Sequence, residues 1–230
     1  MPRKEYQQAL ETLRADVLDM GDLAVSQLTG GLEALETRDD GLAREVIAGD
    51  DDLNDRYLDL ESACVDLLAL QQPVAGDLRF VVASFKIITD IERVGDLATN
   101  LGEYALADGG DRSPERERLA GIDVSGIGAD AKALFEDALA AYEDEDVAAC
   151  RAIAERDDEI DALCTRASEQ VVRDLIERET GGDGWAIERL MDDVSRLLLT
   201  IRDLERVGDH AVNIAARTLY MVESDPELIY

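Results

Sequence analysis

The sequence contains few aromatic residues, few lysines and a single histidine. Aromatic side chains make up 4% of the 230 residues, the lysines are three in number, and the only histidine is His210. The three cysteines, Cys64, Cys150 and Cys164, are an odd number without a CxxC pair. This disfavours a disulfide framework, and with one histidine it also disfavours a zinc site built from cysteine and histidine. We therefore expect the cysteines to be buried free thiols.

Long apolar runs are also missing. No stretch approaches the roughly 18 apolar residues that a membrane-spanning helix requires. The first residues lead directly into an amphipathic segment, without the pattern of a signal peptide. We therefore expect a soluble protein of the cytoplasm.

Basic residues are strongly outnumbered. The chain has 53 Asp and Glu residues against 23 Lys and Arg residues, which gives a formal net charge of -30. Nucleic-acid binding requires concentrated Lys and Arg, so this balance argues against a nucleic-acid partner, and it disfavours adhesion to an anionic lipid surface. An acid excess with arginine in place of lysine resembles the composition of proteins from salt-loving organisms, in which salt screens self-repulsion.

Small and medium apolar residues, by contrast, are abundant. Apolar residues make up 46% of the chain, and the dominance of Ala, Leu, Val and Ile among them is typical of helical bundles. One stretch occurs twice: residues 90–100 are DIERVGDLATN and residues 203–213 are DLERVGDHAVN, with eight identities in eleven positions at a spacing of 113 residues. A repeat at half the chain length predicts a duplicated module.

Apolar residues recur at three- and four-residue steps, which predicts long amphipathic helices. The pattern predicts helices over residues 3–37, 42–70, 75–107, 129–142, 147–178 and 186–221, with a loose tail over residues 224–230. The fold class that follows is all-α, with two tandem, pseudo-symmetric three-helix bundles made of six long helices. We place the first bundle at residues 1–110, a glycine-rich linker at 111–126 and the second bundle at 127–230.

The repeated motif places two acids on one face of each predicted helix. Glu92 precedes Asp96 by four residues, and Glu205 precedes Asp209 by the same interval. On a helix this spacing aligns both carboxylates. The acids continue the apolar stripe of their helix, whereas a solvated charge pair is expected on the opposite face.

Two further acids lie at equivalent positions in the preceding helices. Asp50 and Asp157 are 107 residues apart, and both fall in phase with an apolar stripe. In antiparallel helices joined by a short reversal, residues equally far from the turn face each other, which gathers four oxygen-bearing side chains in each half. The predicted clusters are Asp50, Asn54, Glu92 and Asp96 in the first half, and Asp157, Asp161, Glu205 and Asp209 in the second.

Carboxylates that face one another on partly apolar stripes require protons or cations. One solution is a hard metal ion that prefers oxygen ligands, such as Mg, Mn, Ca or Fe. The alternative is a metal-free structural network in which Arg93 or Arg206 pairs with the acids. With 53 acids in 230 residues, the spacing alone does not decide between these interpretations.

Three other residues of the motif accompany the clusters. Gly95 and Gly208 lie in mid-helix, where glycine costs on the order of 1 kcal/mol relative to alanine. We attribute both to the close approach of a neighbouring helix, with room for a metal-bound water as the second explanation. His210 stands beside Asp209 in the second copy only, either as a packing residue or as a further ligand.

The repeated motif, together with QQPVAGDLR at residues 71–79, closely resembles the PhoU family over nearly the whole chain. The resemblance implies a pair of three-helix bundles and metal centres of the iron or zinc type, so that the expected ion is Fe, Zn, Mn or Mg. The acid pairs of the family fall on Glu92 with Asp96, Glu205 with Asp209, and Asp157 with Asp161. The fourth pair departs from the pattern, because Asn54 follows Asp50, and this is expected to weaken the first site.

The resemblance also implies a function. PhoU proteins are accessory regulators of phosphate-specific transport, so the expected role is a cytoplasmic, non-enzymatic repressor of phosphate uptake and of phosphate-starvation signalling. The implied partners are the ATPase subunit of a phosphate ABC transporter and, in many bacteria, a sensor histidine kinase. We also expect a homodimer.

Two other classes of protein fit the sequence less well. A di-iron oxidase needs Glu-x-x-His pairs on its bundle helices, which a chain with one histidine cannot supply. A helical scaffold whose acidic clusters are structural, Arg-paired and metal-free is the alternative to the regulator, but it needs neither the in-phase acids nor the repeated motif.

Overall fold

The chain is helical in nearly all of the residues that the structure describes. In the computed structural model these are residues 3–71, 75–107, 122–177 and 184–229. The helices are α1 (Arg3–Thr37), α2 (Asp40–Ala48), α3 (Asp50–Gln71), α4 (Ala75–Ala107), α6 (Val124–Asp144), α7 (Val147–Glu177) and α8 (Gly184–Glu223). No strand occurs within the described ranges, so the all-α prediction is confirmed. Among the described helices, none combines the length and the apolar character needed to cross a membrane.

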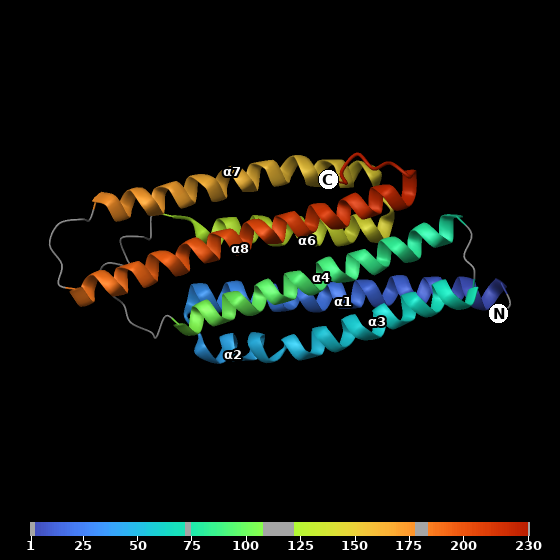
Figure 1. Ribbon diagram of the computed structural model, residues 1–230, viewed down its shortest axis with the longest axis horizontal. Helices are drawn as coiled ribbons and strands as arrows, with labels where there is room; N and C mark the ends of the chain where they lie inside the picture. The colour runs from blue at the N-terminus through green and yellow to red at the C-terminus, as the bar shows by residue number, and fades with distance from the viewer. Residues whose placement is uncertain (1–2, 72–74, 108–121, 178–183, 230) are drawn as a thin grey trace.

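The helices form two bundles that lie side by side (Figure 1). In the first half α4 packs against α1, α2 and α3, and in the second half α8 packs against α6 and α7. The halves meet where α4 packs on α8 and α1 packs on α6, which leaves α7 along one long edge and α2 with α3 along the other. The predicted pair of three-helix bundles is confirmed, with α2 and α3 together taking the place of one helix.

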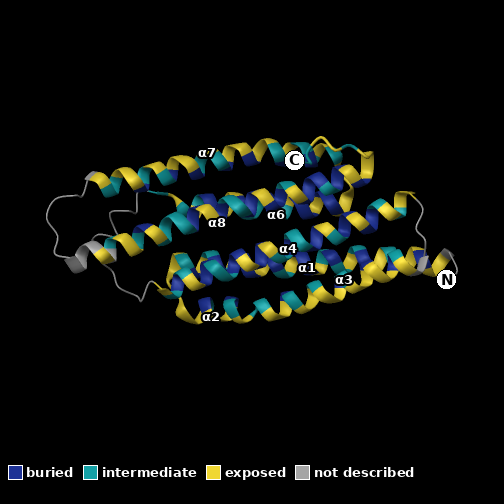
Figure 2. Ribbon diagram, viewed as in Figure 1, coloured by how far each residue is buried: buried dark blue, intermediate teal, exposed yellow. Residues whose placement is uncertain are grey.

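The two bundles share one hydrophobic core. Buried side chains from both halves form one large cluster, whose largest fully buried members include Met20 of α1 and Phe135 and Tyr142 of α6. Figure 2 shows buried positions on the sides of the helices that face one another, and exposed positions along the outer sides of α7 and α3. Apolar burial across the boundary holds the halves together.

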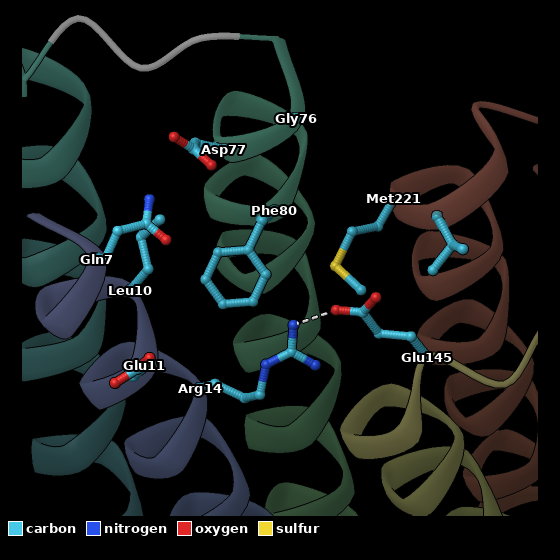
Figure 3. A pocket seen from close by; sticks show the side chains of 10 residues that line it. Gln7, Leu10, Glu11, Arg14, Gly76, Asp77, Phe80, Glu145 and Met221 are labelled. Carbon is cyan, nitrogen blue, oxygen red and sulfur yellow. Dashed lines mark hydrogen bonds and ion pairs between the residues drawn. The ribbon is translucent and has the colours of Figure 1, made fainter. Parts of the chain in front are cut away.

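One end of this boundary is closed by Arg14 of α1 (Figure 3). Its guanidinium donates hydrogen bonds to the backbone oxygens of Tyr142 and Glu143, at 3.0 and 3.1 Å, and pairs with the Glu145 carboxylate. It also lies 4.9 Å from the ring centroid of Phe80 on α4, in a cation–π contact. Arg14 thus joins the first half to the turn between α6 and α7, beside a cavity of about 360 Å³.

The prediction of one helix over residues 42–70 is wrong, because the helix is interrupted at Gly49. The Gly49 carbonyl accepts a hydrogen bond from the Gln27 side-chain amide of α1 at 2.5 Å, and α3 begins with Asp50 directly after it. A side chain that bonds to the backbone ladder in this way is a recognised cause of helix kinks. The equivalent helix α7 runs without a break, so the halves differ at this point.

The first helix of the second bundle begins earlier than the predicted residue 129. Helix α6 starts at Val124, because the Asp123 side chain caps it by accepting a hydrogen bond from the Gly126 backbone N–H at 2.8 Å. Gly128 then allows α1 to approach closely, since a Cβ there would lie 2.5 Å from a methyl carbon of Leu32. Most of the predicted linker over 111–126 lies outside the described residues.

The end of the chain follows a defined course, so the prediction of a loose tail over residues 224–230 is wrong for the part described. Ser224 adopts the left-handed conformation, with φ 60°, and turns the chain back after α8. The Glu227 backbone N–H donates a hydrogen bond to the Asp225 carboxylate at 3.0 Å and holds the turn. We call residues 224–229 the C-terminal strap; the last residue of the chain lies outside the described ranges.

Candidate functional site

The second half brings its four predicted side chains together between α7 and α8. Asp157 and Asp161 lie on α7, and Glu205 and Asp209 lie on α8. Asp157 is 9% exposed and is the most buried of the four. One carboxylate oxygen of Asp157 and one of Asp161 are buried with no hydrogen-bond partner among the described residues. Buried polar atoms are normally paired, so these oxygens point to a cation or a proton as the partner.

Burial and neighbouring acids disfavour the charged forms of Asp157, Asp161 and Glu205 in this second cluster. Burial, and then the charges of Asp161 and Asp209, raise the pKa of Asp157 to about 7. Burial and the charge of Asp209 raise the pKa of Asp161. Burial and the charge of Asp161 raise the pKa of Glu205. The second cluster is therefore an arrangement of like charges that a cation would stabilise.

The first half also gathers its predicted side chains, and there Asp50 has hydrogen-bond partners. The Asp50 carboxylate accepts hydrogen bonds from the Asn54 amide at 2.9 Å and from the Thr99 hydroxyl at 3.3 Å, one on each oxygen. On α4, burial and the charge of Asp96 raise the pKa of Glu92, and burial and the charge of Asp50 raise the pKa of Asp96. Asp50 thus has partners for both oxygens, unlike its counterpart in the second half.

The arginines of the motif do not close either cluster with ion pairs in the part of the chain described. Arg206 pairs instead with Asp203, at 3.8 Å, and Arg93 is exposed. Against the raising effect of burial, the charges of Arg93, Arg206 and His210 lower the pKa of Asp96. The first cluster is therefore partly compensated by positive side chains from both halves, which leaves the second cluster as the stronger candidate for a cation.

The donor set of both clusters suits hard cations. Carboxylate and amide oxygens are the ligands that Mg, Mn and Fe accept readily. Within the described ranges, no three Asp, Glu, His or Cys side chains stand close enough to enclose one ion, so loading would require side-chain rotation. His210 is 8% exposed, and its Nδ1 lies 2.9 Å from the Asp90 carboxylate of α4. Its ring is therefore engaged across the boundary between the halves.

The two glycines of the motif stand where a neighbouring helix approaches closely, as expected. A Cβ at Gly95 would collide with a methyl carbon of Leu53 on α3. A Cβ at Gly208 would collide with the Asp157 carboxylate on α7. The same motif position thus makes room for an apolar side chain in one half and for a candidate ligand in the other.

Gly208→Ala should displace the Asp157 carboxylate and weaken Mn²⁺ binding by the second cluster about tenfold or more, as expected when a group that positions a ligand is changed. Calorimetric titration of the metal-free variant with Mn²⁺ measures this. Gly95→Ala is the matched control, because its added methyl meets Leu53, and it should leave that affinity within about twofold. An equal loss in both variants would contradict the assignment.

The first and last residues of the repeated motif connect the two halves. Asp90 opens the first copy and accepts a hydrogen bond at 3.1 Å from the side chain of Asn213, which closes the second copy. Asp203 opens the second copy and accepts one at 3.2 Å from Asn100, which closes the first. The bonds are reciprocal because α4 and α8 run antiparallel to each other.

Asp203 is the more deeply buried of these two acids, with 0% of its surface exposed. Its carboxylate also accepts hydrogen bonds from the Tyr104 hydroxyl and from the Arg202 guanidinium, both at 2.8 Å. Sequence reasoning missed these contacts, although both acids and both asparagines are among the identities of the repeat. The reason is that distance from a hairpin turn predicts only which residues face each other within one half, whereas these bonds join α4 of one half to α8 of the other.

The fold and the clusters define a class of protein: duplicated three-helix bundles that carry one acid pair on α4 in the first half and one on α8 in the second. The PhoU domain matches residues 17–105 and 124–218, one copy in each half. The chain therefore belongs to the PhoU family, and the resemblance noted in the sequence is confirmed.

Relatives match over nearly the full length. The phosphate-specific transport system accessory protein PhoU homolog of Clostridium acetobutylicum is 29% identical over 223 residues, which cover 96% of this chain and 96% of that protein. The homolog of Caulobacter vibrioides is 33% identical over 214 residues, 92% of this chain and 87% of that protein. The crystal structure of PhoU from Pseudomonas aeruginosa matches with a TM-score of 0.85 at 30% identity, covering 96% of this chain and 100% of that one.

Proposed function

We propose that the chain is a cytoplasmic negative regulator of phosphate uptake and of phosphate-starvation signalling, which acts on a phosphate ABC transporter through its ATPase subunit. The observation that carries the proposal is the match over nearly the whole chain to proteins named phosphate-specific transport system accessory proteins. A sensor histidine kinase is the second proposed partner, and the proposed active form is a homodimer. The role is an accessory one, and we assign no catalysed reaction to it.

The proposal includes metal ions, namely Fe, Zn, Mn or Mg, in the carboxylate clusters. Its support is the pair of unpartnered, buried oxygens on Asp157 and Asp161. A bound cation would supply their partner and offset the repulsion between the acids. Because Asp50 already has Asn54 and Thr99 as partners, we propose that the second cluster binds metal more tightly than the first.

One experiment tests both parts of the proposal. The tagged chain is purified without chelators from cells grown with abundant and with limiting phosphate, and its metal content and co-purified proteins are measured. We expect bound Fe, Mn or Zn, and we expect the ATPase subunit of a phosphate ABC transporter to be recovered from the phosphate-rich cells. Glu205→Ala should lose the metal of the second cluster, whereas Glu159→Ala, which removes an exposed carboxylate of α7, should retain it.

The outcomes separate the regulator from the scaffold. A chain without any bound ion, whose deletion leaves phosphate uptake unchanged, would favour a helical scaffold with structural, metal-free acidic clusters. A chain that recovers the ATPase subunit but no metal would retain the regulatory role and refute the metal sites.

A further inference from the structure

A cavity of about 650 Å³ lies beside the second cluster, between α7, α8 and the C-terminal strap. Asp157, Asp209 and His210 line it from the helices, while Glu227 and Leu228 line it from the strap. Asp157, which carries one of the unpartnered oxygens, therefore borders a space for which the strap forms one wall.

The strap is held to α7 by one arginine. Arg151 pairs with Glu223, the last residue of α8, at 3.0 Å. It also pairs with two strap residues, Asp225 at 3.6 Å and Glu227 at 3.1 Å. Leu228 of the strap packs against the hydrophobic core. In Figure 1 the red end of the chain turns back from the end of α8 towards the first turns of α7.

These contacts are weaker than those that hold the helices together. The three ion pairs of Arg151 are all partly exposed to solvent, and pairs of this kind contribute little to stability. The strap adds two partly buried apolar side chains, Leu228 and Ile229, whereas the helices share the large common core. A segment of low local stability beside a cavity can open without unfolding of the helices.

We propose that the C-terminal strap closes this cavity, that the ion pairs of Arg151 hold the strap in place, and that opening of the strap controls the exchange of the cation held by the second cluster. The closure follows from the contacts of the strap with α7 and with the core. Only the nature of the exchanging ligand rests on the proposed function.

Access to the cavity can be measured without metal. Ala154 lines the cavity and the native cysteines are buried, so Ala154→Cys provides a single accessible thiol for methyl methanethiosulfonate. The reaction of this thiol should accelerate about tenfold when the strap is loosened by Leu228→Ala with Glu227→Gln, or when the ion pairs that hold the strap are removed by Arg151→Ala. Arg156→Ala is the matched control, because Arg156 also lies on α7 but forms its ion pair away from the strap; it should leave the rate unchanged.

Control of cation exchange is measured in the same two variants of the strap contacts, Leu228→Ala with Glu227→Gln and Arg151→Ala, but with the native Ala154. Release of Mn²⁺ to excess EDTA should accelerate by a similar factor, while the equilibrium affinity should change by less than about twofold, because a closure alters entry and exit together. If the rate of the thiol reaction is unchanged both in Leu228→Ala with Glu227→Gln and in Arg151→Ala, the proposed closure is overturned.

The two measurements also separate this inference from the proposed function. A faster thiol reaction with unchanged Mn²⁺ release would overturn the control of exchange, although metal binding itself would stand. If the unaltered protein binds no Mn²⁺, Fe²⁺ or Zn²⁺, the cation is refuted as the ligand of the cavity, and the thiol rates still decide whether the strap closes it.

Discussion

Replacing Asp203 by alanine should lower the free energy of unfolding by about 2 to 3 kcal/mol, because it leaves buried donors without their acceptor. Asn100 and Tyr104 of α4 and Arg202 of α8 all donate to this fully buried carboxylate. The loss falls on the boundary between the halves, where α4 crosses α8. Urea denaturation followed by circular dichroism measures the change.

The control for this substitution is Asp192→Ala, which removes an exposed acid from the same helix and should change stability by less than about 0.5 kcal/mol. A double-mutant cycle between Asp203→Ala and Tyr104→Phe should give a coupling energy of about 1 kcal/mol, because the two side chains share one hydrogen bond. A loss for Asp203→Ala no larger than that of the control would contradict the role of this acid in joining the halves.

Asp157→Asn should stabilise the metal-free protein by about 4 kcal/mol at about pH 8, because the charged form of Asp157 is disfavoured in the folded state. Burial and neighbouring charges raise its pKa from 3.8 to about 7. A group with a raised pKa in the folded state contributes stability at low pH that is lost as the pH rises towards the folded-state pKa. The advantage of the variant should therefore be largest above about pH 7 and small near about pH 4.

Thermal and urea unfolding in the presence of EDTA, across this pH range, measure the effect. Asp158→Asn is the matched control, because Asp158 is the exposed neighbour on the same helix, and it should give no comparable pH-dependent gain. Saturating Mn²⁺ should reverse the order of stabilities, since the metal stabilises the wild-type carboxylate and not the amide. A pH-independent difference between wild type and Asp157→Asn would contradict the raised pKa.

Much of the fold and of the clusters is predictable from the sequence, because both depend on regularities within one half. The apolar period sets the helices, and distance from the hairpin turn sets which residues face each other. This is sufficient to bring Glu205 and Asp209 to Asp157 and Asp161. The resemblance to the PhoU family adds that Asn54 departs from the acid pairs of the family. The structure shows the consequence, because Asn54 donates a hydrogen bond to Asp50.

The features that escaped prediction depend on contacts between distant parts of the chain. The break at Gly49 arises from the side chain of Gln27 on another helix, and helical periodicity does not report such a bond. The course of the strap depends on Arg151, more than seventy residues before it. The reciprocal bonds of Asp90 and Asp203 require the register of α4 against α8, which hairpin geometry within one half does not supply.

The reciprocal bonds between the two copies of the motif follow the contact rule of a two-fold symmetric dimer, in which residue i of one subunit meets residue j of the other and the reverse also holds. Here Asp and Asn exchange hydrogen bonds in this manner within a single polypeptide. A single three-helix module with this motif would carry a self-complementary face, and two separate modules would join through it. The present chain thus has the arrangement expected when the genes of two such partners are fused in tandem, so that an ancestral subunit interface became part of one protein's core.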